Sequence, residues 1–143
     1  MTVSAPDALF DGDTVAVWLA KPNLIFTRVH STQYTGAQAE TFVGPIWSRA
    51  REKLKAKRYV WVSDSRAIAR YDMRSRLLLT RWTLDHRAEL DRILFLVSPQ
   101  HRLVAAGIRV GCLANAAMGI PAFVEASPEA LLERHGIRWP GGL

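Results

Sequence analysis

Apolar residues recur at two different spacings along this chain, and the change of spacing separates predicted strands from predicted helices. Runs rich in β-branched and aromatic residues occupy 14–20 and 24–30, with turn residues at 21–23 between them. Such a pair is typical of an antiparallel hairpin. A further short strand is expected near 8–10, where the acidic turn residues that follow would end it.

A spacing of three to four residues between apolar positions begins after Thr35 and indicates a helix with one buried face. Thr35 is the expected N-cap, and Gln38 stands where a capping box places its second residue. The pattern continues to about Lys57. We expect a kink at Gly44-Pro45, because proline cannot donate a backbone hydrogen bond.

The second half of the chain alternates apolar strands with helices. Strands are predicted at 59–63, 93–97 and 121–125. Helices are predicted from Asp72 onward with Leu77, Leu78 and Trp82 as apolar positions, from Ser98-Pro99 through Gln100 to Met118, and from Ser127 to His135. Strands that alternate with helices imply parallel neighbours and right-handed crossovers. The fold class expected is therefore α/β, with a mixed sheet that has an N-terminal antiparallel hairpin.

The helix expected at 100–118 is apolar nearly all round, which predicts extensive burial. Gly107 and Gly111 lie one turn apart and would let another element approach closely. We favour tight packing on the protein's own sheet over a dimer contact at this pair. Cys112 stands in the same apolar run, where a cysteine is usually an inert core residue.

Composition fits one domain over residues 1–143, with an ordered core at about 7–137. Apolar residues make up 49% of the chain, and loose ends are expected at 1–6 and 138–143. One cysteine excludes an internal disulfide and fits a reducing cytoplasm. The first ten residues show no basic start followed by an apolar run, so no secretory signal is expected. No apolar stretch approaches the ~18 residues that a membrane span needs.

Charge is concentrated in the middle of the sequence. Residues 49–109 hold 15 Lys and Arg against 6 Asp and Glu, a surplus of nine positive charges. The net charge of the whole chain is only +6, so the rest of the chain is mildly acidic. A basic surface favours an acidic protein, an acidic lipid or a nucleic acid. We expect nucleic acid to be unlikely as a partner, because Trp47, Tyr59 and Trp61 appear in buried patterns and no reading motif is present.

One segment carries the candidate site. A buried strand ends at Asp64, a loop follows, and Asp72 opens a helix eight positions later. The chain here resembles the STAS domain of bacterial anti-anti-sigma factors and related lipid-binding proteins, over roughly residues 14–135. Phe123 and the closing helix at 129–132 add to the resemblance.

The resemblance implies a signalling domain whose phosphorylatable Ser or Thr follows the second aspartate. In this chain that residue is Met73, which cannot accept phosphate, and Arg74 and Ser75 follow it. No phosphoswitch is therefore expected. Asp72 is interpreted first as a helix N-cap. Ser65 and Ser75 are considered as surrogate phosphosites and are interpreted as ordinary loop and cap residues.

Arg66, Arg70, Arg74 and Arg76 bracket the same helix start and could together form an anion site. The alternative interpretation is a solvated surface. The basic residues at 49–58 are interpreted as cations that complement a helix C-terminus. No phosphate-binding loop, serine nucleophile motif or metal-ligand spacing occurs, so no cofactor and no enzymatic activity are expected.

These observations predict a non-catalytic interaction domain that binds an acidic protein partner through residues 63–76. The alternative is a binder of an anionic small ligand or lipid head group at the four arginines, with the apolar 100–118 helix lining a pocket. An enzyme would need titratable residues that converge in space, and Asp64 and Asp72 with the arginines are the one cluster that offers this. A homodimer through edge strands of the hairpin is a further expectation.

Overall fold

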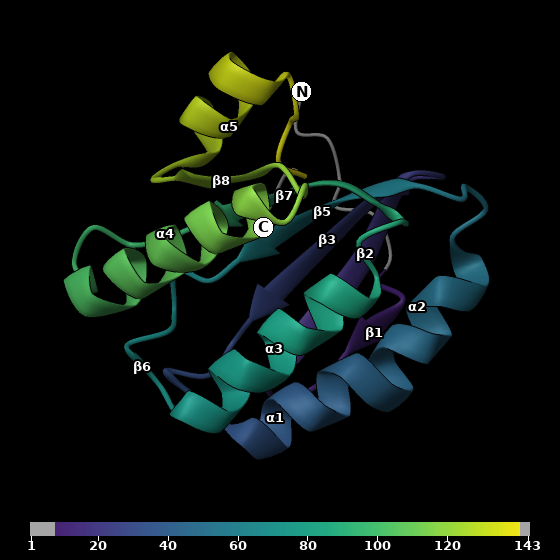
Figure 1. Cartoon of the computed structure of the whole chain (residues 1–143). Helices are drawn as coiled ribbons and strands as arrows, with labels where there is room; N and C mark the ends of the chain where they lie inside the picture. Colours follow the sequence, from purple (N-terminus) through teal and green to yellow (C-terminus); the bar gives the residue numbers. More distant parts are fainter. Residues whose placement is uncertain (1–7, 141–143) are drawn as a thin grey trace.

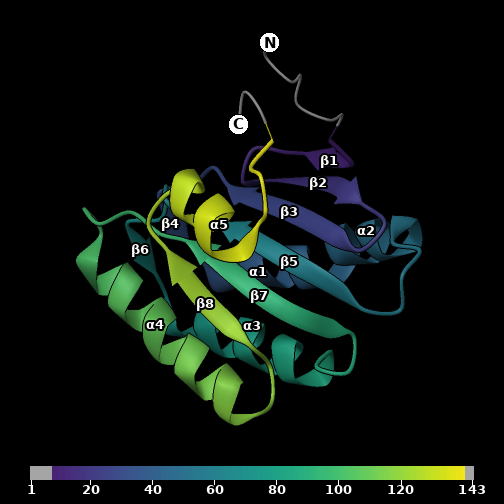
Figure 2. The same ribbon diagram turned by 90° about the horizontal axis from the view of Figure 1, so that it is seen from above.

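The structure, a computed structural model, describes residues 8–140, and the loose end expected at 1–6 lies outside them. Its main sheet has six strands in the order β1-β2-β3-β5-β7-β8, as Figure 2 shows from above. The strands are β1 Phe10–Asp11, β2 Val15–Lys21, β3 Leu24–Val29, β5 Tyr59–Asp64, β7 Leu90–Leu96 and β8 Ala122–Glu125.

Strand direction changes across this sheet. The β1–β2 and β2–β3 pairs are antiparallel, whereas the β3–β5, β5–β7 and β7–β8 pairs are parallel. The mixed sheet predicted from the hairpin and the alternating elements is therefore confirmed. β1 pairs with Val17 and Ala16 and so covers part of the outer edge of β2. The homodimer expected at that edge stays a prediction.

The helices divide between the two faces of the sheet. Figure 1 shows α5 (Pro128–His135) on one side, with the remaining helices on the other. The helices of that other face are α1 Gly36–Thr41, the π-helical turn η1 Phe42–Ile46, α2 Trp47–Lys53, α3 Met73–Asp85 and α4 Arg102–Ala117. Because successive strand residues point to opposite faces, each strand supplies both layers of the core.

The first helix forms as its sequence predicts and ends earlier. Thr35 Oγ1 accepts from the backbone N–H of Gln38 at 3.3 Å, and the Gln38 side chain accepts from the Thr35 N–H at 3.0 Å. The expected kink at Pro45 is a π-helical turn, which accommodates the missing donor. The helix ends at Lys53 and not at 57, because Leu54 turns to an extended conformation and is buried in the core.

An aromatic cluster fills the space between the sheet and α1–α3. The Trp82 ring centroid lies 4.8 Å from that of Trp47 and 5.5 Å from that of Trp61, both in edge-to-face geometry that aromatic pairs prefer. Phe42 stacks on Trp61 at 5.7 Å. Trp47, Tyr59 and Trp61 are all buried, as predicted, so these rings are not exposed for base stacking.

Two very short strands form a second, parallel pair that the sequence pattern did not reveal. β4 (Gln33–Tyr34) pairs with β6 (Arg70–Tyr71), with Tyr34 opposite Tyr71. A two-residue strand is too short to show alternation. The pair brings the start of α1 beside the start of α3, and this places much of the candidate site.

The structure corrects the prediction for α4, the helix expected at 100–118. It begins at Arg102, because Ser98 and Pro99 form a turn in which Ser98 Oγ accepts from the Gln100 N–H at 3.2 Å. It is also not buried all round: the Leu103 side chain is 88% exposed, and Val110 and Leu113 are exposed as well. Leu77 of α3, expected on the apolar face, is likewise exposed.

The C-terminal elements cover the other face of the sheet. Ser127 caps α5 by accepting from the Ala130 N–H at 3.1 Å, and Gly136 ends it at φ 67°, a left-handed conformation that favours glycine. Beyond it, Trp139 packs edge-on against Phe26 with 5.0 Å between ring centroids. The folded core therefore extends past the predicted limit at 137.

Candidate functional site

The nine residues singled out between Asp64 and Arg76 do not form one cluster. Alternation along β5 directs Trp61 and Ser63 toward α1–α4 and Asp64 toward α5. The residues that follow divide into a network on the α5 face, a cap between two helices, an exposed surface and the wall of a cavity.

Asp64 is the centre of the network on the α5 face, and its side chain is 5% exposed. Its Oδ2 atom accepts from Arg28 Nε at 2.9 Å and from an Arg66 guanidinium nitrogen at 2.8 Å, and its Oδ1 atom accepts from Arg66 Nε at 2.9 Å. Burial alone would raise the pKa of Asp64, but the hydrogen bonds and charges of the two arginines hold that pKa below its usual value. Both guanidinium groups also lie over the Trp139 ring.

Asp72 is the N-cap predicted for α3, and it also holds α1. Its Oδ1 atom accepts from the Ser75 N–H at 2.7 Å, and its Oδ2 atom accepts from the Gly36 N–H at 3.0 Å. Hydrogen bonds from these two backbone groups lower the pKa of Asp72. A side chain on Gly36 would overlap the Arg74 stem, so glycine permits this close approach of the two helices.

Three of the predicted residues face solvent. Met73, at the position of the family's phosphorylatable residue, is 64% exposed, and Arg70 is exposed in β6. Arg74 pairs with Glu40 of α1 at 2.7 Å. Arg66 and Arg74 are thus both matched by carboxylates, which leaves Arg70 and Arg76 as the two members of the predicted arginine cluster with no ion pair to any described residue.

The remaining predicted residues, Ser65, Ser75 and Arg76, line a cavity of about 130 Å³ between the sheet, the η1 turn and helices α3 and α4. Ser65 and Ser75 are buried, so neither offers a kinase an accessible hydroxyl. The wall is mostly apolar, and aromatic rings make up much of it: Tyr34, Phe42, Trp61, Tyr71 and Phe95. Among the residues that line the cavity, Thr80 of α3 is the exposed one. The opening of the cavity to solvent therefore lies beside α3.

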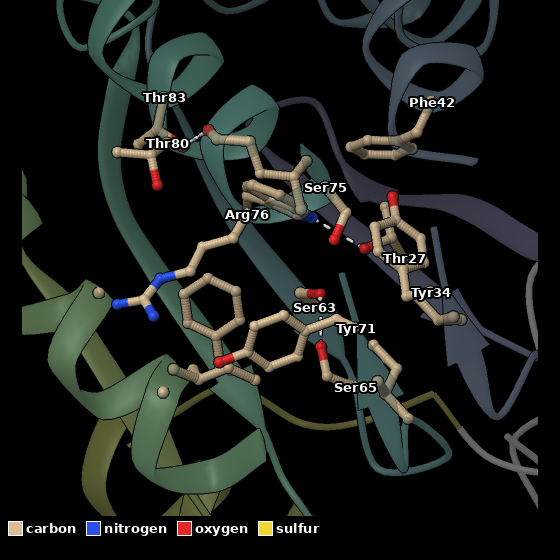
Figure 3. A pocket seen from close by; sticks show the side chains of 18 of the residues that line it. Thr27, Tyr34, Phe42, Ser63, Ser65, Tyr71, Ser75, Arg76, Thr80 and Thr83 are labelled. Atoms are coloured by element: carbon tan, nitrogen blue, oxygen red, sulfur yellow. Dashed lines mark hydrogen bonds between the residues drawn. The ribbon is translucent and has the colours of Figure 1, made fainter. Parts of the chain in front are cut away.

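Several hydroxyl groups in the cavity already have protein partners (Figure 3). Thr27 accepts from Trp61 Nε1 at 2.8 Å, and Ser75 donates to the Asp72 carbonyl at 2.8 Å. The Ser63 and Ser65 hydroxyls pair at 3.2 Å. These groups stabilise the wall and have less capacity left for a ligand.

Other polar groups of the cavity have no hydrogen-bond partner among residues 8–140. They are the Asn115 amide, the Arg76 guanidinium and the hydroxyls of Tyr34, Tyr71 and Thr80. Asn115 is 9% exposed, and its amide is free to bind a ligand placed in the cavity. Burial raises the pKa of Tyr34, so its hydroxyl is a neutral donor. An apolar cavity with a few convergent polar groups is the usual form of a small-molecule site.

Sequence reasoning missed Asn115, Tyr34 and Tyr71. A signal for Asn115 is present: Ile108, Gly111 and Asn115 follow one another on a single face of α4, and an amide there interrupts an otherwise apolar stripe. Tyr34 and Tyr71 come together through the β4–β6 pair. Gly107 gives room for this arrangement, because a side chain there would overlap the Tyr71 hydroxyl, whereas a side chain on Gly111 would meet nothing within 4 Å. The close approach expected at the glycines thus occurs at Gly107 alone, and against a tyrosine instead of the sheet.

Other candidate chemistry lies apart from the cavity. Burial raises the pKa of the Cys112 thiol to about 11, which disfavours the reactive thiolate. Within residues 8–140, no three His, Cys, Asp or Glu side chains gather to hold a metal ion. In the same range, no helix is long and apolar enough to cross a membrane.

Comparison with known proteins bears on the fold. No protein-family model and no curated protein matches the sequence. A crystal structure of an uncharacterised DUF3478-family protein from Shewanella loihica PV-4, described as having a SpoIIAA-like fold, matches with a TM-score of 0.62. The chain has a SpoIIAA-like, that is STAS-like, fold. The match covers 87% of this chain and 96% of the other at 14% identity, so the likeness concerns the fold alone.

Proposed function

We propose that this protein is a non-catalytic, STAS-like binding domain of the bacterial cytoplasm that takes a small, largely apolar ligand in the cavity between its sheet and α3–α4. The proposal modifies the alternative predicted from the sequence, which is an anionic small ligand or lipid head group at four arginines. The site becomes the cavity, and the ligand becomes largely apolar. The observation that supports it best is the Asn115 amide, nine-tenths buried, without a partner in the described part of the chain, and on the cavity wall.

The size of the cavity limits the ligand. A cavity of about 130 Å³ is close to the ~150 Å³ of engineered apolar cavities that bind benzene. A lipid head group at the arginine cluster is less well supported, because Arg66 and Arg74, half of the cluster, pair with carboxylates.

Titration with toluene, followed by backbone amide shifts in NMR spectra, tests the proposal. We expect a dissociation constant of about 0.1–1 mM, a range typical of fragment-sized ligands, with the largest shifts at residues that line the cavity. If the cavity binds water and not toluene, the amide shifts will not saturate as toluene is added, and that result would contradict the proposal.

A protein partner at 63–76 is a second proposal, and one observation favours it. Met73 and Leu77 are both exposed and stand one turn apart on α3, and the exposed Arg70 of β6 precedes Met73 by three residues. An apolar pair beside an unmatched cation suits an acidic partner with an apolar centre.

Replacing Met73 by aspartate tests this surface. We expect the amount of partner that the protein captures from the host to fall at least tenfold. The change adds a negative charge to the apolar pair, and this charge repels an acidic surface. Leu103→Asp, at another exposed apolar position, is the matched control and retains capture. Equal capture by wild type and Met73→Asp would exclude this surface.

A further inference from the structure

The charge on the cavity wall selects among small apolar ligands. Arg76 is the one charged residue among the described residues that line the cavity, and no carboxylate lies there to balance it. Its stem lies along the wall, and in the view of Figure 3 its guanidinium lies away from the Ser63–Ser65 pair. A guanidinium beside an apolar cavity binds a carboxylate through charge-assisted, bidentate hydrogen bonds.

The shape of the wall selects further. Five aromatic side chains surround the space, and their rings offer faces and edges to a planar guest. Asn115 is more deeply buried than Arg76 and carries an amide that both donates and accepts. A ligand that satisfies both groups has a charged end at Arg76 and a polar substituent at Asn115.

On this basis we infer that the ligand is a small aromatic carboxylic acid, with its carboxylate at Arg76, its ring among the aromatic side chains, and a hydroxyl or similar substituent at Asn115. The inference rests on the proposed function, since it specifies the ligand of the same cavity. It adds a testable charge preference. It also narrows the anion site that the sequence predicts at four arginines to Arg76 alone, and it gives Asn115 a role that the sequence analysis did not.

Calorimetric titrations with five matched probes test the class. Benzoate carries the charge, benzamide has the same shape without it, toluene has the ring alone, and octanoate has the carboxylate on a flexible chain. We expect benzoate to bind about tenfold more tightly than benzamide and more tightly than octanoate. 3-Hydroxybenzoate is expected to bind more tightly than benzoate, because its hydroxyl reaches Asn115.

Variants assign the preference to residues. Arg76→Gln should weaken benzoate by about tenfold to a hundredfold, the loss typical of one charge-assisted contact, and change toluene affinity less than twofold. Arg70→Gln removes an exposed arginine outside the cavity and should leave every probe unchanged. Asn115→Leu should abolish the advantage of 3-hydroxybenzoate over benzoate, and melting curves establish that each variant is folded.

The outcomes separate the two proposals. Toluene binding together with equal affinities for benzoate and benzamide would overturn the acid class and leave the cavity proposal standing. Tighter binding of octanoate than of benzoate would overturn the aromatic part of the inference. Absence of binding by every probe would overturn the proposed function itself.

Discussion

Replacing Asp64 by asparagine is expected to lower the free energy of unfolding by about 3 kcal/mol, because removing one partner of a buried ion pair leaves the other charges without compensation. The carboxylate accepts three side-chain hydrogen bonds from Arg28 and Arg66 and one from the Arg66 backbone N–H at 3.1 Å. An asparagine of the same shape offers one oxygen and turns two donors toward the arginines. Urea denaturation at pH 7 measures the effect.

Asp91→Asn is the matched control for this substitution. Asp91 pairs with Arg58 at 2.9 Å, a distance similar to those at Asp64, but its side chain is 46% exposed. Exposed ion pairs contribute about 0–1 kcal/mol. A loss at Asp64→Asn no greater than that at Asp91→Asn would contradict a structural role for the network.

The same network predicts the direction of acid sensitivity. The pKa of Asp64 is lower in the folded protein than in an unfolded chain, as is that of Asp72. Their stabilisation is therefore fully present above the unfolded pKa of about 3.9 and is lost as the pH falls below it toward the folded pKa. The stability difference between wild type and Asp64→Asn should consequently be constant near neutral pH and shrink as the pH falls below about 4.

Replacing Gly111 by leucine is expected to weaken toluene and benzoate binding by about a hundredfold while the fold remains intact. A side chain at this position meets open space in the cavity wall, so leucine can extend into the volume that a ligand would occupy. Leucine also has a higher helix propensity than glycine, by up to ~1 kcal/mol. The variant should therefore be at least as stable as the wild type and yet unable to bind.

Ala114→Leu separates blockage from any general effect of enlarging α4. Ala114 lies on the same helix but is exposed and does not line the cavity. Its leucine variant should bind both probes like the wild type. Unchanged binding by Gly111→Leu would place the ligand site elsewhere.

Much of the fold follows from local sequence signals. The Thr35–Gln38 capping box, the Asp72 and Ser127 caps and the terminating Gly136 all lie where their residue types predict, because capping depends on a few adjacent groups. The hairpin and the parallel strands follow from apolar spacing in the same way. Helix limits at Lys53 and Arg102 could not be predicted, because tertiary burial of Leu54 and the turn at Ser98 override local preference.

The candidate site depends on contacts that no local pattern carries. The aspartate spacing identifies the segment, but alternation along β5 sends Asp64 to one face of the sheet and Ser63 to the other. The partners of Arg66 and Arg74 decide which arginines remain unmatched, and those partners follow from the fold. Tyr34 and Asn115 come from elements distant in sequence, so their meeting in one cavity is visible only in three dimensions.

A crystal structure of the protein grown with 4-bromobenzoate tests the central claim most directly. The account predicts an anomalous bromine peak inside the cavity among the Phe95, Trp61 and Tyr71 rings, with the carboxylate within hydrogen-bonding distance of Arg76. A bromine peak at the molecular surface, or a cavity that holds ordered water alone at saturating ligand, would contradict the claim that this cavity is the functional site.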